Sequence, residues 1–275
     1  MNFIYGTLSL SAPLLLASYG ALISEYAGCM ALFLDGIINL SAFLCFAYTV
    51  LTGSAVSGIF LAAMTGMLFI TAAGIATEKL HANAFLAAIA LNLLCSALTS
   101  ILSVRYFGTR GVLTSPSFTF NASHMRLMTT AASLLITAAG IAALYLTRQG
   151  LYIRITGSDP DVLEAKGINT SVLRTAAWST AALAGAVTGC IFSLRLSSFV
   201  PNVSSGTGWT ALAAVFLGKK NTAAVTAAVF VFSAAQFTAS NIQNVSSLKA
   251  VPPSLLLALP YLTALLLIVF SPRHQ

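Results

Sequence analysis

The closest-spaced group of chemically active side chains is a set of three acids, Asp159, Asp161 and Glu164. Carboxylates at this spacing are candidate ligands for a divalent cation. Acids also favour the first turn of a helix, and proline favours its first position, which Pro160 would occupy. We therefore expect a short helix from about Pro160 to Lys166, capped by the Asp159 side chain and closed by Gly167, and no metal site.

Other motifs that carry out chemistry are missing from the sequence. It contains no P-loop, no His-Glu-x-x-His, no Gly-x-Ser-x-Gly and no Cys-x-x-Cys. Nucleotide hydrolysis and the common hydrolase and metal sites are therefore unsupported. The four cysteines are scattered, mostly within apolar runs, and are expected to be free thiols. We expect a chain that binds no cofactor and is not an enzyme.

The elements that must position these residues are apolar. The 275 residues are 58% hydrophobic and 7% charged, with a mean hydropathy of +0.91. A soluble fold would expose much of that apolar surface, so the composition indicates an integral membrane protein. The formal charge of +7 comes from singly scattered Lys and Arg. This pattern indicates membrane topology and argues against a nucleic-acid partner.

A membrane-spanning helix needs about 20 apolar residues. Spans are predicted at residues 3–23, 29–51, 55–77, 83–104, 127–147, 173–195, 222–243 and 254–271. The apolar stretch at 209–218 is too short and follows a glycine-rich segment, so we interpret 199–218 as a broken span lining a cavity. The expected fold is an all-α integral membrane protein: about eight transmembrane helices, one broken or re-entrant span and a cytoplasmic coupling helix, in a single domain of residues 1–275.

Polar residues inside the predicted spans leave two interpretations open. Asp35 is the acid that lies deepest in an apolar stretch. An acid at membrane depth is by default a candidate functional residue. Asp35 has either a role in gating or helix breaking, or simple hydrogen bonds to a neighbouring backbone group or to Asn39. The asparagines Asn39, Asn83 and Asn92 either line a solute path or join helices. Glu25, at the end of a span, is expected to be solvated.

Small residues recur at four-residue spacing in one predicted span, at Ala181, Gly185 and Gly189. This spacing lets helix backbones approach closely. We expect the stripe to pack within the chain rather than to form a dimer contact.

The basic residues indicate an orientation. If residues 148–174 are cytoplasmic, alternating spans put eight basic residues inside and five outside, a bias in the expected sense. The inside set is Lys79, Arg148, Arg154, Lys166, Arg174, Lys219, Lys220 and Arg273. The outside set is Arg105, Arg110, Arg126, Arg195 and Lys249.

Residues 157–169 read Gly-Ser-Asp-Pro-Asp-Val-Leu-Glu-Ala-Lys-Gly-Ile-Asn. This stretch resembles the cytoplasmic coupling loop of bacterial ATP-binding cassette importer permeases of the branched-chain amino acid and simple sugar type. In that family the pattern is Gly-x-Asn-Pro-x-Ala-Ala, three further positions, then Gly-Ile-Asn. Here Asp159 replaces the Asn, while Val162 and Leu163 replace the paired Ala.

Other segments resemble the nucleoside and simple-sugar branch of this family, whose permeases work with lipoprotein receptors. The most specific is Ser-Phe-Val-Pro-Asn at 198–202 followed by residues 206–218, and the likeness covers nearly the whole chain. Departures from the family pattern at residues 31–36 and at Ala84 leave the solute open among a nucleoside, a simple sugar and riboflavin.

We expect the surface that couples to an ATPase to comprise Asp159, Pro160, Asp161, Leu163, Glu164, Lys166 and Gly167. We expect the translocation path to include Asp35, Asn39, Asn83, Asn92, Phe199, Asn202, Gly206 and Trp209.

The resemblance implies a multi-pass permease subunit in the lipid of the bacterial inner membrane. Its partners would be a cytoplasmic ATP-binding subunit that uses the ATP, a second permease subunit forming a homo- or heterodimer, and an extracytoplasmic solute-binding lipoprotein. The alternative is a stand-alone secondary transporter driven by an ion gradient, in which Asp35 would be the ion site.

Overall fold

The computed structural model describes residues 3–242, and helices make up most of this range. They are α1 Phe3–Tyr26, α2 Leu34–Thr52, α3 Ala55–Lys79, α4 Ala84–Phe107, α5 Ala122–Leu146, α6 Arg148–Thr156, α7 Pro160–Ala165, α8 Thr170–Leu196, α9 Thr207–Leu217 and α10 Thr222–Ile242, with a 3-10 turn, η1 Pro116–Phe118. Seven helices of the described range are long and apolar enough to cross a membrane. The chain is a multi-pass membrane protein, and the span predicted at 254–271 lies outside the described residues.

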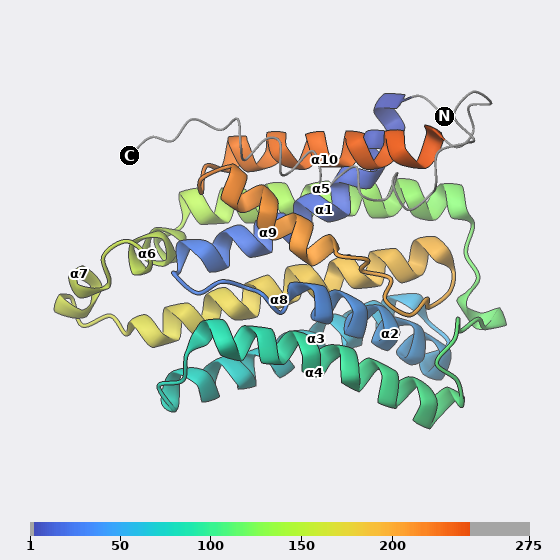
Figure 1. The fold of residues 1–275 in the computed structure, drawn as a ribbon, viewed down its shortest axis with the longest axis horizontal. Coiled ribbons are helices and arrows are strands. Elements are labelled where there is room, and N and C mark those ends of the chain that lie inside the picture. The colour runs from blue at the N-terminus through green and yellow to red at the C-terminus, as the bar shows by residue number, and fades with distance from the viewer. Residues whose placement is uncertain (1–2, 243–275) are drawn as a thin grey trace.

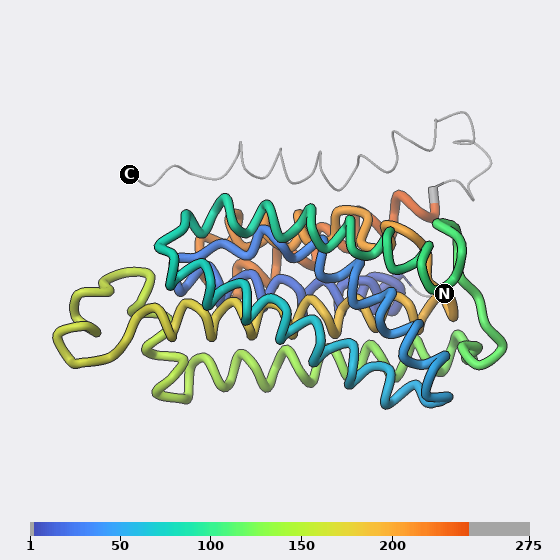
Figure 2. The backbone as a smooth tube through the Cα atoms, turned by 90° about the horizontal axis from the view of Figure 1, so that it is seen from below, coloured from blue at the N-terminus to red at the C-terminus, as the bar shows by residue number. Residues whose placement is uncertain are grey.

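The long helices run side by side along the long axis of the molecule (Figure 1). Helix α8 lies at the centre, packed against α1, α2 and α3, while α3, α4, α5 and α10 turn much of their surface outward. Helices α6 and α7 project beyond one end of the bundle, as both views show (Figures 1 and 2). We call this the α7 end.

Five of the seven predicted spans within the described range begin within about three residues of the observed helices, while α5 begins at Ala122 rather than residue 127, and α2 differs in the other direction. The prediction begins that span at residue 29, but the helix begins at Leu34. Residues 27–33 instead form turns and irregular backbone, with Gly28 in the left-handed region at φ +74°. Helix α2 therefore starts inside the bundle rather than at its edge (Figure 1).

The small-residue stripe of α8 packs inside the chain, as predicted. A Cβ at Gly189 would lie 2.1 Å from the carbonyl oxygen of Ile38, and one at Gly185 would lie 2.7 Å from the Ile37 side chain, both on α2. Across the helix, a Cβ at Gly20 of α1 would lie 3.1 Å from the Ala181 backbone. Only small residues allow α1, α2 and α8 to come this close.

A partly buried arginine compensates for a proline inside α1. Pro13 lacks the amide that would donate to the Ser9 carbonyl one turn earlier. Arg195, in the last turn of α8, donates from Nη1 to that carbonyl at 2.7 Å. Its Nε and Nη2 donate to the hydroxyls of Thr129 and Thr130, each at 2.9 Å. One guanidinium thus joins α8, α1 and α5 through its fixed fork of donors.

Within the described range, the basic residues fall into the two groups predicted from the sequence. Seven lie at the α7 end, namely Lys79, Arg148, Arg154, Lys166, Arg174, Lys219 and Lys220. Four lie at the opposite end, namely Arg105, Arg110, Arg126 and Arg195. Lys249 and Arg273 lie outside the described residues. The positive-inside rule then predicts that the α7 end is cytoplasmic.

Candidate functional site

Helix α6 was not predicted from the sequence, which reads as polar loop after α5. The Thr147 hydroxyl accepts from the Gly150 amide at 3.1 Å and caps the helix. A Cβ at Gly150 would lie 2.2 Å from the Leu144 carbonyl oxygen. A glycine in the first turn of α6 is therefore what allows the chain to turn sharply out of α5.

Helix α7 forms where the prediction put it, with Pro160 at its first position. The capping prediction for Asp159 is wrong, because its side chain accepts no hydrogen bond from the first turn. The Asp159 amide instead donates to the Ile155 carbonyl at 2.8 Å. This bond to α6 holds the backbone at φ −152° and ψ 81°, which keeps the carboxylate away from the first-turn amides.

The Gly-Ile-Asn ending joins α7 to α8 without a spacer. Gly167 takes φ +74° and ends α7, and the Ile168 amide donates back to the Leu163 carbonyl at 3.0 Å. This is a Schellman-type helix end. The next residue, Asn169, caps α8 by accepting from the amides of Ser171 and Val172. A short connection of hydrogen-bonded residues thus links α7 to the start of a central helix.

The side chains of α7 divide into an inner and an outer face. Leu163 is 1% exposed and anchors the helix, and the Glu164 carboxylate accepts from the Thr170 hydroxyl at 2.9 Å. An open groove of about 320 Å³ runs beside Glu164 and residues 167–171. We call the exposed side chains Asp159, Asp161, Val162 and Lys166 the outer face, while Glu164 is exposed too but turns to Thr170.

The segment between α6 and α7 touches the end of α1 through backbone atoms. A Cβ at Gly157 would lie 2.2 Å from the Tyr26 carbonyl oxygen and 2.7 Å from the Gly28 amide nitrogen. No other residue type allows this approach, and its tightness makes the contact stiff. The sequence carries no long-range signal that pairs residue 157 with residue 26.

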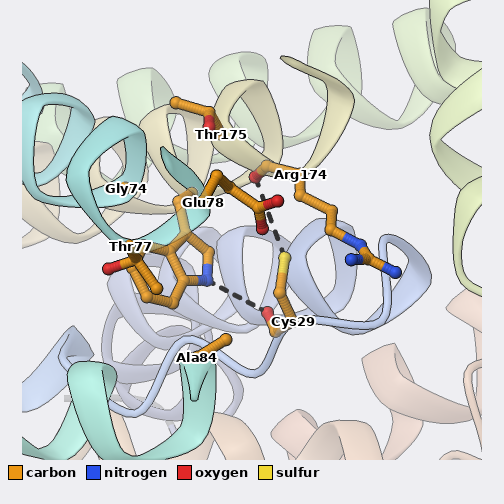
Figure 3. Close-up of a pocket in the computed structure, with 8 residues that line it drawn as sticks. Cys29, Gly74, Thr77, Glu78, Ala84, Arg174 and Thr175 are labelled. Atoms are coloured by element: carbon orange, nitrogen blue, oxygen red, sulfur yellow. Dashed lines mark hydrogen bonds between the residues drawn. The ribbon is translucent and has the colours of Figure 1, made fainter. Parts of the chain in front are cut away.

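A small cavity lies beside this contact, between the ends of α3 and α8 (Figure 3). Its volume open to water is about 10 Å³, room for roughly one water molecule, so it is too small for a solute. The Trp178 indole donates to the Cys29 carbonyl at 3.3 Å, and the Cys29 thiol donates to the carbonyls of Ser24 and Arg174. Burial raises the pKa of Cys29 to about 12, so its thiol stays neutral. These bonds fasten the irregular segment before α2 to α8.

A second site lies where two helices begin inside the bundle. Helix α2 starts at Leu34, and the eleven-residue α9 starts at Thr207, after the irregular stretch predicted as a broken span. The Asp35 carboxylate accepts from the Gly208 amide and from the Ser204 hydroxyl, both at 3.1 Å. The acid caps α9 from another helix, where its negative charge meets the positive ends of both helix dipoles. The hydrogen bond to a backbone amide is thus present, and a role of Asp35 in gating stays a prediction.

Two predicted asparagines support the same meeting point. The Asn39 amide oxygen accepts from the Val203 amide at 3.2 Å, one helical turn along α2 from Asp35. The Asn92 amide oxygen accepts from the Gly36 amide at 2.6 Å and so ties α4 to the first turn of α2. Irregular backbone at membrane depth is stable only when such partners satisfy its polar groups.

The other predicted path residues are more dispersed. Asn83 caps α4 at the α7 end by accepting from the amides of Phe85 and Leu86. Phe199 is buried and pairs its backbone with Leu113 of the loop before η1.

Residues of the segment before α9 adopt left-handed backbone, Asn202 at φ +56° and Gly206 at φ +82°. Trp209, in the first turn of α9, is 44% exposed. Membership of all these residues in a solute path stays a prediction.

The polar side chains of this arrangement hold helix ends in place. Among residues 3–242, no group of three or more His, Cys, Asp or Glu side chains is placed to hold a metal ion. In both sites, side-chain hydrogen bonds hold the ends of helices. One site is the exposed projecting segment, and the other lies inside the bundle.

Comparison with known proteins agrees with this arrangement. The model of the family described as branched-chain amino acid transport system / permease component matches residues 3–270. The nucleoside ABC transporter permease protein NupC of Lactococcus lactis is 26% identical, over 94% of this chain and 88% of that protein. The guanosine ABC transporter permease protein NupQ of Bacillus subtilis is 24% identical, also over 94% of this chain and 88% of that protein.

Two further proteins extend the comparison. A putative glucose ABC transporter permease protein of Haloferax volcanii, TsgC13, is 28% identical over 76% of this chain and 68% of that protein. Among solved structures, PsaBC from Streptococcus pneumoniae in complex with Fab has a TM-score of 0.53 at 13% identity, covering 99% of this chain and 93% of that one. This structural likeness concerns the fold alone.

Proposed function

The chain belongs to the branched-chain amino acid transport system / permease component family, and we propose that it carries a nucleoside, driven by ATP hydrolysed on a separate subunit. The observation that carries the proposal is the projecting helix α7, whose inner side is anchored and whose outer side is exposed. A short, stiff helix outside the spans is suited to docking in a groove of a partner. The partner would be a cytoplasmic ATP-binding subunit, and this chain itself would bind no cofactor.

The path for the solute would run between this chain and a second permease subunit. Supporting this, the start of α9 presents an exposed aromatic side chain, Trp209, close in sequence to the exposed Asn202. A second subunit facing them would close a cavity lined by an aromatic ring and polar groups, as solute sites usually are. An extracytoplasmic solute-binding lipoprotein would deliver the solute to the end opposite α7.

A nucleoside is proposed as the solute because the two relatives covering 94% of the chain are named for nucleosides and guanosine. A planar base can stack on an exposed indole such as that of Trp209. A simple sugar, for which one shorter-matching relative is named, and riboflavin are the competing solutes.

Co-purification tests the ATP-binding partner. The tagged chain is isolated from its own membranes in mild detergent, and the accompanying proteins are identified by mass spectrometry. We expect an ATPase with a P-loop, and we expect the charge reversals Asp161→Lys and Lys166→Glu together to release it. Lys79→Glu, also exposed at the α7 end, is the matched control and should retain it. A homodimer that transports without any ATPase would contradict the proposal.

Binding to the delivery protein tests the solute. The lipoprotein recovered with the complex is titrated with guanosine, ribose and riboflavin, and its thermal unfolding is followed. Guanosine is expected to raise the unfolding temperature most. Stabilisation by ribose or riboflavin alone would contradict the nucleoside assignment and leave the importer intact.

A further inference from the structure

Helix α9 is held at both ends by side chains of other helices. At its N-terminus the Gly208 amide is bound by Asp35 of α2. At its C-terminus, the turn that joins it to α10 is bound by the end of α1. The Tyr26 hydroxyl donates to the Lys220 carbonyl, and the Lys220 ammonium lies 3.3 Å from the Glu25 carboxylate and 3.2 Å from the Glu25 carbonyl oxygen. The expectation that Glu25 is simply solvated is therefore wrong, since its side chain is only 13% exposed.

The turn after α9 is a fixed shape rather than a loose connection. Lys219 and Lys220 take φ values of +47° and +62°, in the left-handed region that side chains other than glycine disfavour. A Cβ at Gly218 would lie 2.6 Å from the Val225 amide nitrogen, so α9 and α10 are closely packed at this corner. Backbone in such a conformation persists only when its surroundings hold it. Backbone hydrogen bonds within the turn supply part of that support, and Tyr26 and Glu25 add to it.

Residues 148–169 carry α6 and α7, and we call them the α7 segment. They touch the bundle at the same end of α1. Gly157 contacts the Tyr26 backbone so closely that a Cβ would lie 2.2 Å from its carbonyl oxygen. A second connection runs through α5. The Arg154 guanidinium of α6 lies 4.8 Å from the centre of the Tyr145 ring, and the Tyr145 hydroxyl lies 2.7 Å from the hydroxyl of Thr222, the first residue of α10.

We propose that α9 transmits displacements from the α7 end to the site inside the bundle, and we call it the strut. The ends of α1 and α5 would pass displacements of the α7 segment to the α9–α10 turn. Helix α9 would then pass them to the contact with Asp35. The strut is one continuous helix of eleven residues, about 16 Å long, whose two ends are joined by an unbroken ladder of backbone hydrogen bonds. Tyr26, Glu25 and Lys220 are then positioning residues of the transport cycle. That role rests on the proposed function, whereas the mechanical connection is a property of this chain alone.

The contribution of the Glu25–Lys220 pair to stability separates a role in transmission from a purely structural role. The Glu25–Lys220 pair is partly exposed, with the lysine side chain at 44%. Such pairs add little to stability. Breaking the pair should therefore leave the fold intact and change how far a disturbance travels.

The test uses the purified chain in detergent, without any partner, so its result does not depend on capturing an ATPase. Trp209→Cys places a thiol at the far end of α9, and its labelling by a fluorescent maleimide is timed. Gly157→Ala disturbs the α7 segment, and Gly111→Ala in the opposite loop, where a Cβ meets only Thr109 Oγ1 at 3.3 Å, is the matched control. The native thiols are all buried and should label slowly, namely Cys29, Cys45, Cys95 and Cys190.

We expect Gly157→Ala to change the labelling rate about fivefold, the low end of coupling between distant sites, and Gly111→Ala to leave it unchanged. In the background of Tyr26→Phe with Lys220→Met the effect of Gly157→Ala should shrink, because only the connection through α5 remains. The swap Glu25→Lys with Lys220→Glu should retain it. Tyr106→Phe with Lys79→Met is the control background, since both side chains are exposed at other helix ends.

Two results would overturn the strut. One is an absent response to Gly157→Ala, and the other is a response of equal size in the Tyr26→Phe, Lys220→Met background. If Gly157→Ala fails to fold, Arg154→Met replaces it as the disturbance, because it removes the cation from the Tyr145 ring without a backbone clash. A strut that transmits in a chain that recruits no ATPase would contradict the proposed function and leave the strut standing.

Discussion

Replacing Asp35 separates a structural cap from an ion-binding site. Its carboxylate receives two hydrogen bonds, one from the buried Gly208 amide and one from the Ser204 hydroxyl. Asp35→Ala leaves the amide without a partner. A hydrogen bond to a charged group contributes roughly 1.5–3 kcal/mol, so we expect a loss of about 2 kcal/mol in unfolding free energy.

Asp35→Asn should cost much less, because the amide oxygen still accepts from Gly208 and the Ser204 hydroxyl can rotate to accept from the new amide group. Equilibrium unfolding in mixed micelles measures both variants, and solute uptake into proteoliposomes is measured alongside. Asp35→Asn should keep most of its uptake, whereas a secondary transporter that binds its ion at Asp35 would lose all of it. Equal damage by Asn and Ala in both assays would refute the cap.

Three further outcomes follow from the structure. Arg195→Met should cost about 1 kcal/mol more in the native chain than in a Pro13→Ala background, because alanine at position 13 restores an amide donor to the Ser9 carbonyl. Additive losses would contradict the pairing of Arg195 with Pro13. Leu163→Ala removes the anchor of α7 and should cost about 2 kcal/mol locally, seen as faster hydrogen exchange in α7 with the spans unchanged; unaltered exchange would show that the anchor is not needed. The pKa of Cys29 is raised from 9.0 to about 12, which lowers its thiolate fraction about a thousandfold at pH 8. Iodoacetamide should therefore modify it slowly, and faster only as the pH rises. Alkylation at the rate of a free cysteine, measured by mass spectrometry, would contradict that burial.

Local sequence signals were enough to predict the spans and α7. Continuous apolar runs mark the long helices because the membrane demands about 20 such residues. Pro160 and Gly167 mark the ends of α7 because each fits a backbone position that few other residues accept. The same reasoning failed for the Asp159 side chain, whose orientation is set by the bond of its own amide to α6.

The contacts that join the two sites left no local signal. Glu25 and Lys220 are 195 positions apart, and nothing near either residue in the sequence indicates the other. Gly157 reads as an ordinary loop glycine until the Tyr26 backbone is seen against it. Helix α6 was missed because Arg148, Gln149 and Gly150 open it with polar or flexible residues, and its stability comes from the Thr147 cap and from packing. Tertiary contacts decide these features.

Uptake into proteoliposomes tests the central claim most directly. The chain is reconstituted with the ATPase and the binding lipoprotein that co-purify with it, and radiolabelled guanosine uptake is followed with ATP, without ATP, and with an imposed proton or sodium gradient. Uptake is expected only with ATP, and it should be lost when Asp161→Lys and Lys166→Glu alter the outer face of α7. Guanosine accumulation driven by an ion gradient in vesicles that contain this chain alone would contradict the central claim.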